Sequence, residues 1–154
     1  TNTRTITATE MGTAWSPQQI EFSTNHNWIF IRSLYDYSIS FFAFSGNANS
    51  GDMEFVSTKN IGGSSNINIY TMLVDEVRKK IYFAHNGYGN IFIVMHPWNP
   101  STGLLGEQEQ KISVYNDTHK SVSLSKTLQR LYVNTEKESK VYGFYSDGTL
   151  GYLG

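Results

Sequence analysis

The sequence predicts an all-β protein made of three repeats of about 50 residues each. Short aromatic and β-branched runs recur at 28–31, 80–83 and 130–133, and Phe30, Tyr82 and Tyr132 are separated by 52 and 50 residues. A second apolar run follows each of them, and a turn rich in Gly, Asn and Asp follows that. Aromatic residues reach 14% and charged residues only 16%, which favours β-structure over disorder. Repeats of this length with four short strands are typical of β-propeller blades.

Each repeat is expected to contain four strands, named a to d in chain order. An apolar run without alternation, such as 91–95, indicates burial on both faces, as in a blade between two others. The expected strands are 18–23, 28–33, 38–44 and 53–58 in the first repeat, 67–74, 80–84, 90–95 and about 107–113 in the second, and 120–125, 130–134 and 140–145 in the third.

The third repeat shows no obvious strand d, because only residues 151–154 follow Leu150. A β-rich segment at 3–10 precedes the first strand a at the distance expected of a strand d. We therefore expect an N-terminal strand to supply the outer strand of the third blade. The predicted organisation is a single domain over 1–154, with repeats at about 15–60, 64–114 and 117–150 and a closing strand at 1–12.

Three blades do not close a propeller ring, which takes about four to eight. One expectation is a homodimer in which two half-rings exchange their N-terminal strands and complete six blades. The other, given equal weight, is that the chain is a fragment of one larger propeller. A stable two-chain ring would bury the apolar end faces of both subunits.

The repeats also carry a family resemblance. Residues 77–91 read VRKKIYFAHNGYGNI, and LYVN at 131–134 and STGLL at 101–105 continue the pattern. These segments resemble blades of the lactonase-type propellers, the 6-phosphogluconolactonase and carboxymuconate-cyclase group. The resemblance implies the propeller fold and, for function, a lactonase or a cyclising lyase. That family has more blades than the three found here.

Four residues are candidates for catalysis on the face formed by the d–a and b–c connections. The resemblance places His119 at the start of an inner strand, where a neutral imidazole can act as a general base. His85 would supply a second imidazole, Arg32 would bind a carboxylate and Glu136 would orient the base. The alternative for each is structural: a hydrogen bond to a loop for the histidines, and surface charge for Arg32 and Glu136.

Ligand contacts are expected from amides and aromatic rings in the same connections. Tyrosine rings can stack on sugars while amides bind hydroxyl groups, although packing between blades also consumes aromatic residues. The candidates are Gln18, Gln19, Asn66, Asn68, Tyr35 and Tyr88.

Composition and motifs exclude several classes of function. A net charge of −1 gives no basic surface for nucleic acid, and no apolar stretch is long enough to cross a membrane. The histidines lack metal-ligand spacing, cysteine is absent, and no nucleotide fingerprint or nucleophile elbow occurs, so neither a metal nor a cofactor is predicted. The compartment is open, with a secreted or cell-surface location favoured over the cytoplasm.

Taken together, the sequence favours a binding or interaction module that presents channel-mouth loops to a small molecule, a glycan or a protein. No complete catalytic constellation is visible, which argues against an enzyme. The alternative is a lactonase-like or cyclising-lyase enzyme that acts on a sugar-acid or carboxylated lactone.

Overall fold

The computed structural model describes residues 16–35, 38–47, 52–63, 69–87, 90–114, 119–125, 127–135 and 137–154. Over these ranges the chain forms three four-stranded antiparallel sheets and no helix, which confirms the predicted all-β propeller class. The first sheet contains β1 (Pro17–Ser23), β2 (Trp28–Tyr35), β3 (Ser38–Asn47) and β4 (Asp52–Gly63). The second contains β5 (Ile69–Asp75), β6 (Lys80–Gly87), β7 (Asn90–Pro97) and β8 (Gln110–Val114), and the third β9 (His119–Ser125), β10 (Arg130–Thr135), β11 (Ser139–Phe144) and β12 (Leu150–Tyr152).

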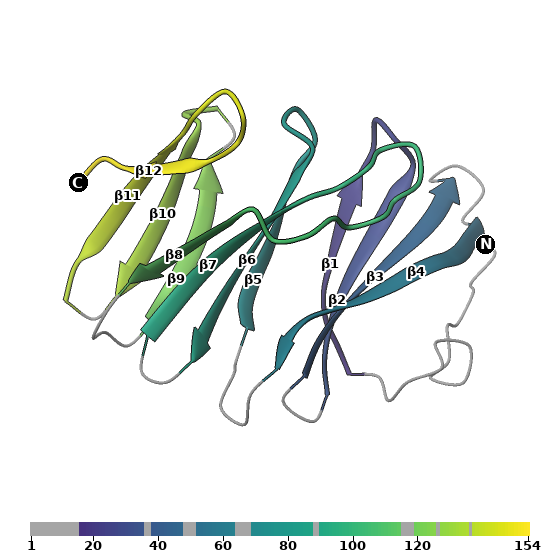
Figure 1. Cartoon of the computed structure of the whole chain (residues 1–154), viewed down its shortest axis with the longest axis horizontal. Helices are drawn as coiled ribbons and strands as arrows, with labels where there is room; N and C mark the ends of the chain where they lie inside the picture. The colour runs from purple at the N-terminus through teal and green to yellow at the C-terminus, as the bar shows by residue number, and fades with distance from the viewer. Residues whose placement is uncertain are drawn as a thin grey trace.

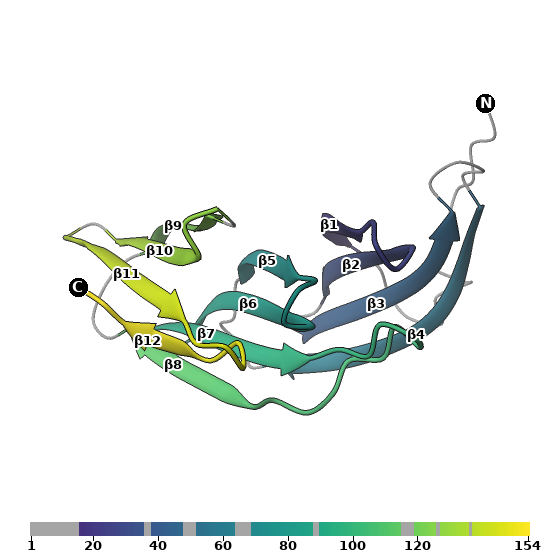
Figure 2. The same cartoon turned by 90° about the horizontal axis from the view of Figure 1, so that it is seen from above.

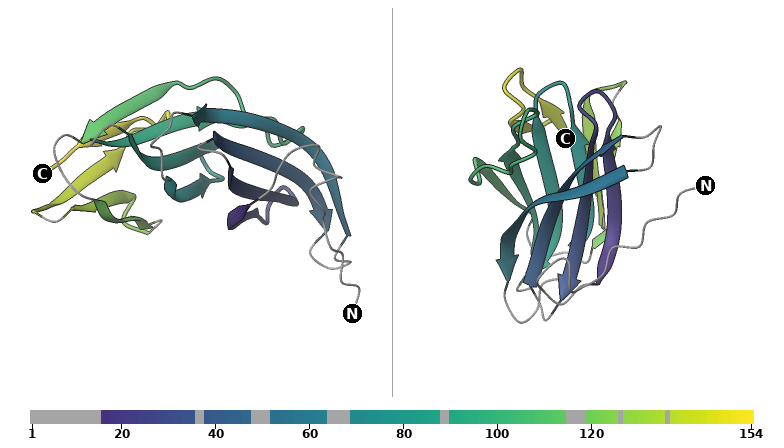
Figure 3. Two further views of the ribbon diagram at one scale, coloured as in Figure 1. Left: turned by 90° about the horizontal axis from the view of Figure 1, so that it is seen from below. Right: turned by 90° about the vertical axis from the view of Figure 1, so that its right-hand side faces the viewer.

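The three sheets stand side by side in an arc, as blades do in a propeller (Figures 1 and 2). The inner strands β1, β5 and β9 lie on the concave side, and β4, β8 and β12 lie on the convex side (Figure 3). β1 contacts β5, and β5 contacts β9. The a–b turns lie at the upper end of the sheets in Figure 1, and the b–c connections lie at the lower end.

Two hydrophobic clusters fill the interfaces between neighbouring sheets. We call the interface between the first and second sheets the first seam, and that between the second and third sheets the second seam. The first seam buries Trp28, Phe30, Phe41, Ala43, Met72, Val74, Ile81, Phe83, Val94, Trp98 and Leu105. The second seam buries Tyr82, Ile91, Ile93, Met95, Val114, Leu131, Val133, Tyr142 and Leu150.

The a–b turn ends in the same backbone conformation in every sheet. Its last residue has a positive φ in each case: 55° at Asn27, 58° at Lys79 and 52° at Gln129. These residues are spaced like the aromatic positions of the repeat. Since only Asn among the three tolerates the left-handed region well, the same turn is imposed on Lys79 and Gln129 by the hairpin that they close.

In each seam, an aromatic side chain of strand b donates a hydrogen bond to the c–d turn of the next sheet. Trp28 donates from Nε1 to the Pro100 carbonyl over 2.7 Å, and Gly103 (φ 69°) lies directly under its ring. In the second seam, the Tyr82 hydroxyl donates to the Gly148 carbonyl over 2.7 Å. Both turns therefore need a glycine where the neighbouring sheet approaches most closely.

The fourth strand of the third sheet differs from the expectation. Leu150–Tyr152 forms β12, pairing with β11 through Phe144↔Leu150 and Tyr142↔Tyr152. The Leu153 N–H donates to the Val141 carbonyl, and the Val141 N–H donates to the Gly154 carbonyl, which extends this pairing. The position assigned to the N-terminal strand is thus occupied by the C-terminal residues, and 3–10 lies outside the described residues. β12 escaped detection because three residues with a central glycine fall below the usual length and propensity of a strand.

Candidate functional site

The predicted site residues that the structure describes gather at the b–c end of the sheets, the lower end in Figure 1. Arg32 and His85 lie near the ends of β2 and β6, and Tyr35 ends β2. His119 begins β9 opposite Thr135. Gln18 and Gln19 lie near the start of β1. The remaining candidates, Asn66, Asn68, Tyr88 and Glu136, lie outside the described residues.

A β-bulge recurs at this end of every inner strand. The pairing between strands a and b shifts between Pro17 and Gln19, between Ile69 and Thr71, and opposite Asn134 and Thr135. The extra residue is Gln18 in the first sheet and its repeat equivalents, Tyr70 and Lys120, in the others. Bulges redirect the chain and are common beside functional sites. The sequence analysis named Gln18 as a ligand-contact candidate but did not predict the bulge.

The Gln19 side chain links the first sheet to the second. Its side-chain amide donates to the Met72 carbonyl over 2.8 Å and accepts from the Met72 N–H over 2.7 Å. A further hydrogen bond of 2.9 Å runs from Nε2 to the Glu21 carboxylate. The amide predicted for ligand contact therefore clamps β1 to β5.

Arg32 and His85 are buried side chains, only 4% and 8% exposed. Side chains alternate along a strand, so Arg32 shares a face with Phe30, and His85 shares a face with Phe83. Both of those phenylalanines belong to the first seam. Arg32 and His85 therefore face the same interface at the same end of the sheets.

The physical settings of these two side chains differ. Burial lowers the pKa of Arg32, because desolvation disfavours its charged form. The His85 ring lies 5.3 Å from the Phe92 ring, between centroids. A buried guanidinium and an imidazole that face one seam can bind an anionic group and move a proton, which is the chemistry expected of a small carboxylate site.

His96 is a third buried polar residue of the first seam, but its surroundings are structural. Its Nδ1 lies 3.0 Å from the Gly106 carbonyl, and its ring meets the edge of Phe83. Burial is the largest of the influences that lower the pKa of His96. The sequence analysis did not single out this residue.

The part of the chain that the structure describes contains no group of three or more His, Cys, Asp or Glu side chains arranged to hold a metal ion. No helix among the described residues is long and apolar enough to span a bilayer.

A cavity of about 290 Å³ lies at the opposite end, beneath the a–b turns. All three sheets contribute to it. Its lining residues are Phe22, Thr24, Asn25, Val74, Asp75, Glu76, Val77, Gln129 and Phe144. Sequence reasoning missed this cavity, because its lining comes from three segments that are far apart in the chain.

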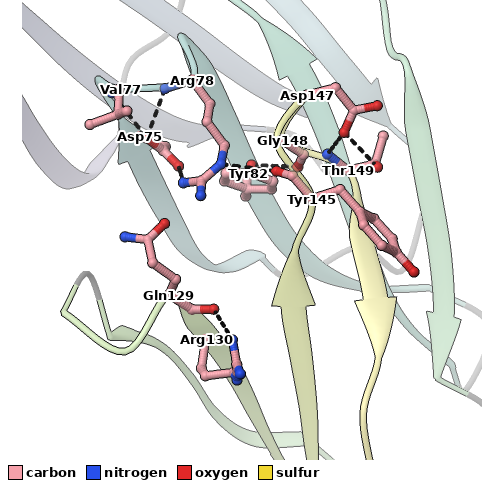
Figure 4. A network of polar contacts seen from close by, with 10 residues as sticks. All are labelled: Asp75, Val77, Arg78, Tyr82, Gln129, Arg130, Tyr145, Asp147, Gly148 and Thr149. Atoms are coloured by element: carbon pink, nitrogen blue, oxygen red, sulfur yellow. Dashed lines mark hydrogen bonds and ion pairs between the residues drawn. The ribbon is translucent and has the colours of Figure 1, made fainter.

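Polar contacts hold the wall of the cavity in place (Figure 4). The Asp75 carboxylate accepts from the N–H groups of Val77 and Arg78, and its other oxygen pairs with the Arg78 guanidinium over 2.8 Å. Arg78 also donates from Nε to the Tyr145 carbonyl and lies 5.3 Å from the centre of the Phe144 ring. Arg78 thus links the second sheet to the third beside the cavity.

Comparison with known proteins gives matches only among solved structures; no protein-family model and no curated protein matches the chain. A periplasmic gluconolactonase of Pseudomonas aeruginosa matches with a TM-score of 0.69 and 16% identity over 90% of this chain and 39% of its own. A protein from Lactobacillus plantarum matches with a TM-score of 0.73 and 14% identity, covering 91% of this chain and 41% of its own.

A putative 6-phosphogluconolactonase from Bacteroides fragilis matches with a TM-score of 0.67 and 10% identity, covering 89% of this chain and 37% of its own. This chain thus spans about two fifths of each of these structures. At such low identity the matches speak to the fold alone. The three sheets share the β-propeller fold of these structures and cover part of it.

Proposed function

We propose that the chain is a binding module that recognises a small carboxylate-bearing molecule at the b–c end of the first seam. The observation that carries the proposal is the placement of Arg32 and His85 on faces that meet in this seam. The repeat-equivalent positions that face the second seam are Ala84 and Thr135. Arginine suits the role because its planar guanidinium binds a carboxylate through two parallel hydrogen bonds.

The internal repeat serves as a control for this interpretation. Positions needed for packing recur in kind, as the large aromatic residues Phe30, Tyr82 and Tyr132 do. A polar pair that occurs in one seam and not in its repeat is therefore not required by blade packing. Buried ionisable groups that the fold does not require are candidates for function.

For assembly, we propose a homodimer that completes a six-bladed ring by packing end sheets together, since β12 occupies the position that strand exchange would use. Ile20 and Phe22 are 51% and 57% exposed, whereas their repeat equivalents Met72 and Val74 are 0% and 3% exposed within the first seam. A neighbouring blade would cover them. A native mass near twice 17.4 kDa is expected, and a stable monomer would contradict the dimer.

A second candidate function is a lactonase-like or cyclising-lyase activity on a sugar-acid or carboxylated lactone. It is favoured by the names of two neighbours in fold, a gluconolactonase and a putative 6-phosphogluconolactonase. In this version His119 and His85 act as general bases, Arg32 binds the carboxylate and Glu136 orients a base. The periplasmic source of the first neighbour also favours a location outside the cytoplasm.

Calorimetric titration with D-gluconate and a hydrolysis assay with D-glucono-δ-lactone distinguish the two functions. A binding module gives saturable binding of gluconate and no hydrolysis above the rate in buffer. The Arg32→Lys variant should bind about tenfold more weakly or worse, because a two-point hydrogen bond to the carboxylate is lost. Arg130→Lys, a half-buried arginine of the third sheet, is the matched control and should bind normally.

Hydrolysis above the rate in buffer that disappears in His119→Ala or His85→Ala would instead establish the enzyme. If gluconate binding is absent, or is unchanged in a folded Arg32→Lys variant, the carboxylate site is wrong. Circular dichroism of each variant separates loss of binding from loss of the β-structure.

A further inference from the structure

The cavity beneath the a–b turns lies at the end of the sheets opposite the proposed carboxylate site. Its volume of about 290 Å³ is at the lower limit of ligand pockets, which range from roughly 300 to 1,000 Å³. Because all three sheets line it, a ligand there would contact the three innermost hairpins together. Small molecules are the class that such a volume admits.

Apolar side chains give the cavity a surface for a hydrophobic group. Val77 is 85% exposed, although turns usually present polar residues to water. Val74, which is buried, and Phe144 complete the apolar lining. Burial of an apolar ligand group against these side chains would remove exposed hydrophobic area from water.

Both ionisable side chains that line the cavity are acidic, but their charges are compensated differently. Asp75 is paired with Arg78, whose guanidinium lies outside the lining and is held by the third sheet. Glu76 instead accepts from the Thr24 N–H over 2.8 Å and from the Asn25 side-chain amide. Both of its donors are neutral. These two hydrogen bonds fix the carboxylate without cancelling its charge.

We propose that this cavity is a binding site for a small primary amine carried on an apolar group. The ammonium group would pair with Glu76, and the apolar group would rest against Val77 and Phe144. The amides of Asn25 and Gln129 and the Thr24 hydroxyl supply acceptors for the remaining ammonium hydrogens. An anionic analogue would place like charges together, and a neutral one would lose the ion pair.

The test uses 2-phenylethylamine as the probe, with 2-phenylethanol and 3-phenylpropionate as its neutral and anionic counterparts. Titration of the ¹⁵N-labelled chain should shift the amide signals of Thr24, Asn25, Glu76 and Val77 in a saturable way for the amine. The alcohol should bind about fivefold more weakly, the effect expected of a partly exposed ion pair, and the acid should not bind at all. Glu76→Gln should bring the affinity for the amine down to that for the alcohol.

Glu54→Gln, which removes an exposed carboxylate of β4 away from the cavity, is the matched control and should bind the amine normally. Val77→Ala should weaken the amine and the alcohol alike, since it removes apolar contact and no charge. The proposal is wrong if the amine gives no saturable shifts, if Glu76→Gln and Glu54→Gln behave the same, or if the anion binds as well as the amine. Gluconate binding at the b–c end is measured separately, so the outcome for the amine does not decide the outcome for the carboxylate site.

Discussion

The two seams are assembled by the same devices but bury different kinds of side chain. In both, a strand-b aromatic residue donates a 2.7 Å hydrogen bond to a c–d turn of the next sheet. In both, a glutamine clamps the backbone of the next sheet through donor and acceptor together: Gln19 on Met72 in the first seam, and Gln110 on Leu150 in the second.

Aromatic rings pack against one another in the first seam. Between ring centroids, Phe30 lies 5.3 Å from Phe41 and 5.2 Å from Trp98. The second is largely aliphatic. Strand alternation places four of the described buried polar side chains in the first seam: Ser23, Arg32, His85 and His96. The repeat therefore determines how the sheets are joined, whereas departures from the repeat indicate where polar side chains are concentrated.

The largest effect is expected from the glycines under the two aromatic ties. A Cβ at Gly103 would lie 2.3 Å from the rigid Trp28 ring, whereas one at Gly148 would meet the flexible Lys80 side chain at 2.7 Å. Both residues also have positive φ. We expect Gly103→Ala to cost about 3 kcal/mol or more and Gly148→Ala about 1–2 kcal/mol, because only Lys80 can move aside. Urea unfolding measures both, and equal losses would contradict this account of the first seam.

A pH dependence should distinguish the seams next. The pKa of His96 is lowered in the folded chain, mainly by burial, from an ordinary value of 6.5. The unfolded chain therefore binds the proton more tightly, and stability should fall as the pH drops through 6.5, then level off below the folded pKa. The slope cannot exceed about 1.4 kcal/mol per pH unit for this one group.

Urea unfolding between about pH 7.5 and 5.5 measures this effect above the range where carboxylates titrate. His96→Gln is the control and should reduce the slope. If the slope is the same in wild type and His96→Gln, the first seam does not owe its pH dependence to His96.

Each glutamine clamp should contribute less to the free energy of unfolding, and the two clamps should stabilise different parts of the chain. Gln19→Met and Gln110→Met each leave one N–H and one carbonyl of a neighbouring strand without the amide, at a cost of about 1–2 kcal/mol. Gln19 holds the innermost strands, so its loss should lower global stability. Gln110 holds the short C-terminal strand β12, so its loss should speed hydrogen exchange at Leu150 more than at Met72. Equal exchange at both amides in Gln110→Met would refute this local effect.

The repeat made much of this fold predictable, because a fixed spacing constrains many positions at once. Phe30, Tyr82 and Tyr132 identified three strands b, and the same spacing recurs in the left-handed turn residues and the bulges. β12 could not be predicted, since its pairing depends on β11 rather than on its own composition. The expected strand 53–58 was likewise too short, because β4 extends to Gly63 along the whole of β3.

The candidate site was predictable only in part, for a related reason. Residue type and strand end pointed to Arg32 and His85, but not to the seam that they share, which depends on strand alternation and on the neighbouring sheet. Gln19 shows the converse: its type suggested ligand contact, yet the backbone of Met72 is within its reach. The cavity at the a–b turns draws on three distant segments, so no local pattern could reveal it.

The smallest effect is expected from the hydroxyl that ties the second seam. Tyr82 is 1% exposed, and burial is the main cause of its raised pKa, so its proton remains available to the Gly148 carbonyl. Tyr82→Phe keeps the ring in the seam and removes only this donor, at a cost of about 1 kcal/mol.

Tyr132 occupies the same repeat position in the third sheet but is half-buried, with no following sheet described. Tyr132→Phe should therefore change the free energy of unfolding by less than about 0.5 kcal/mol. A Tyr132→Phe loss as large as that of Tyr82→Phe would show that Tyr132 already makes a comparable tie, as a further blade packed on the third sheet would provide.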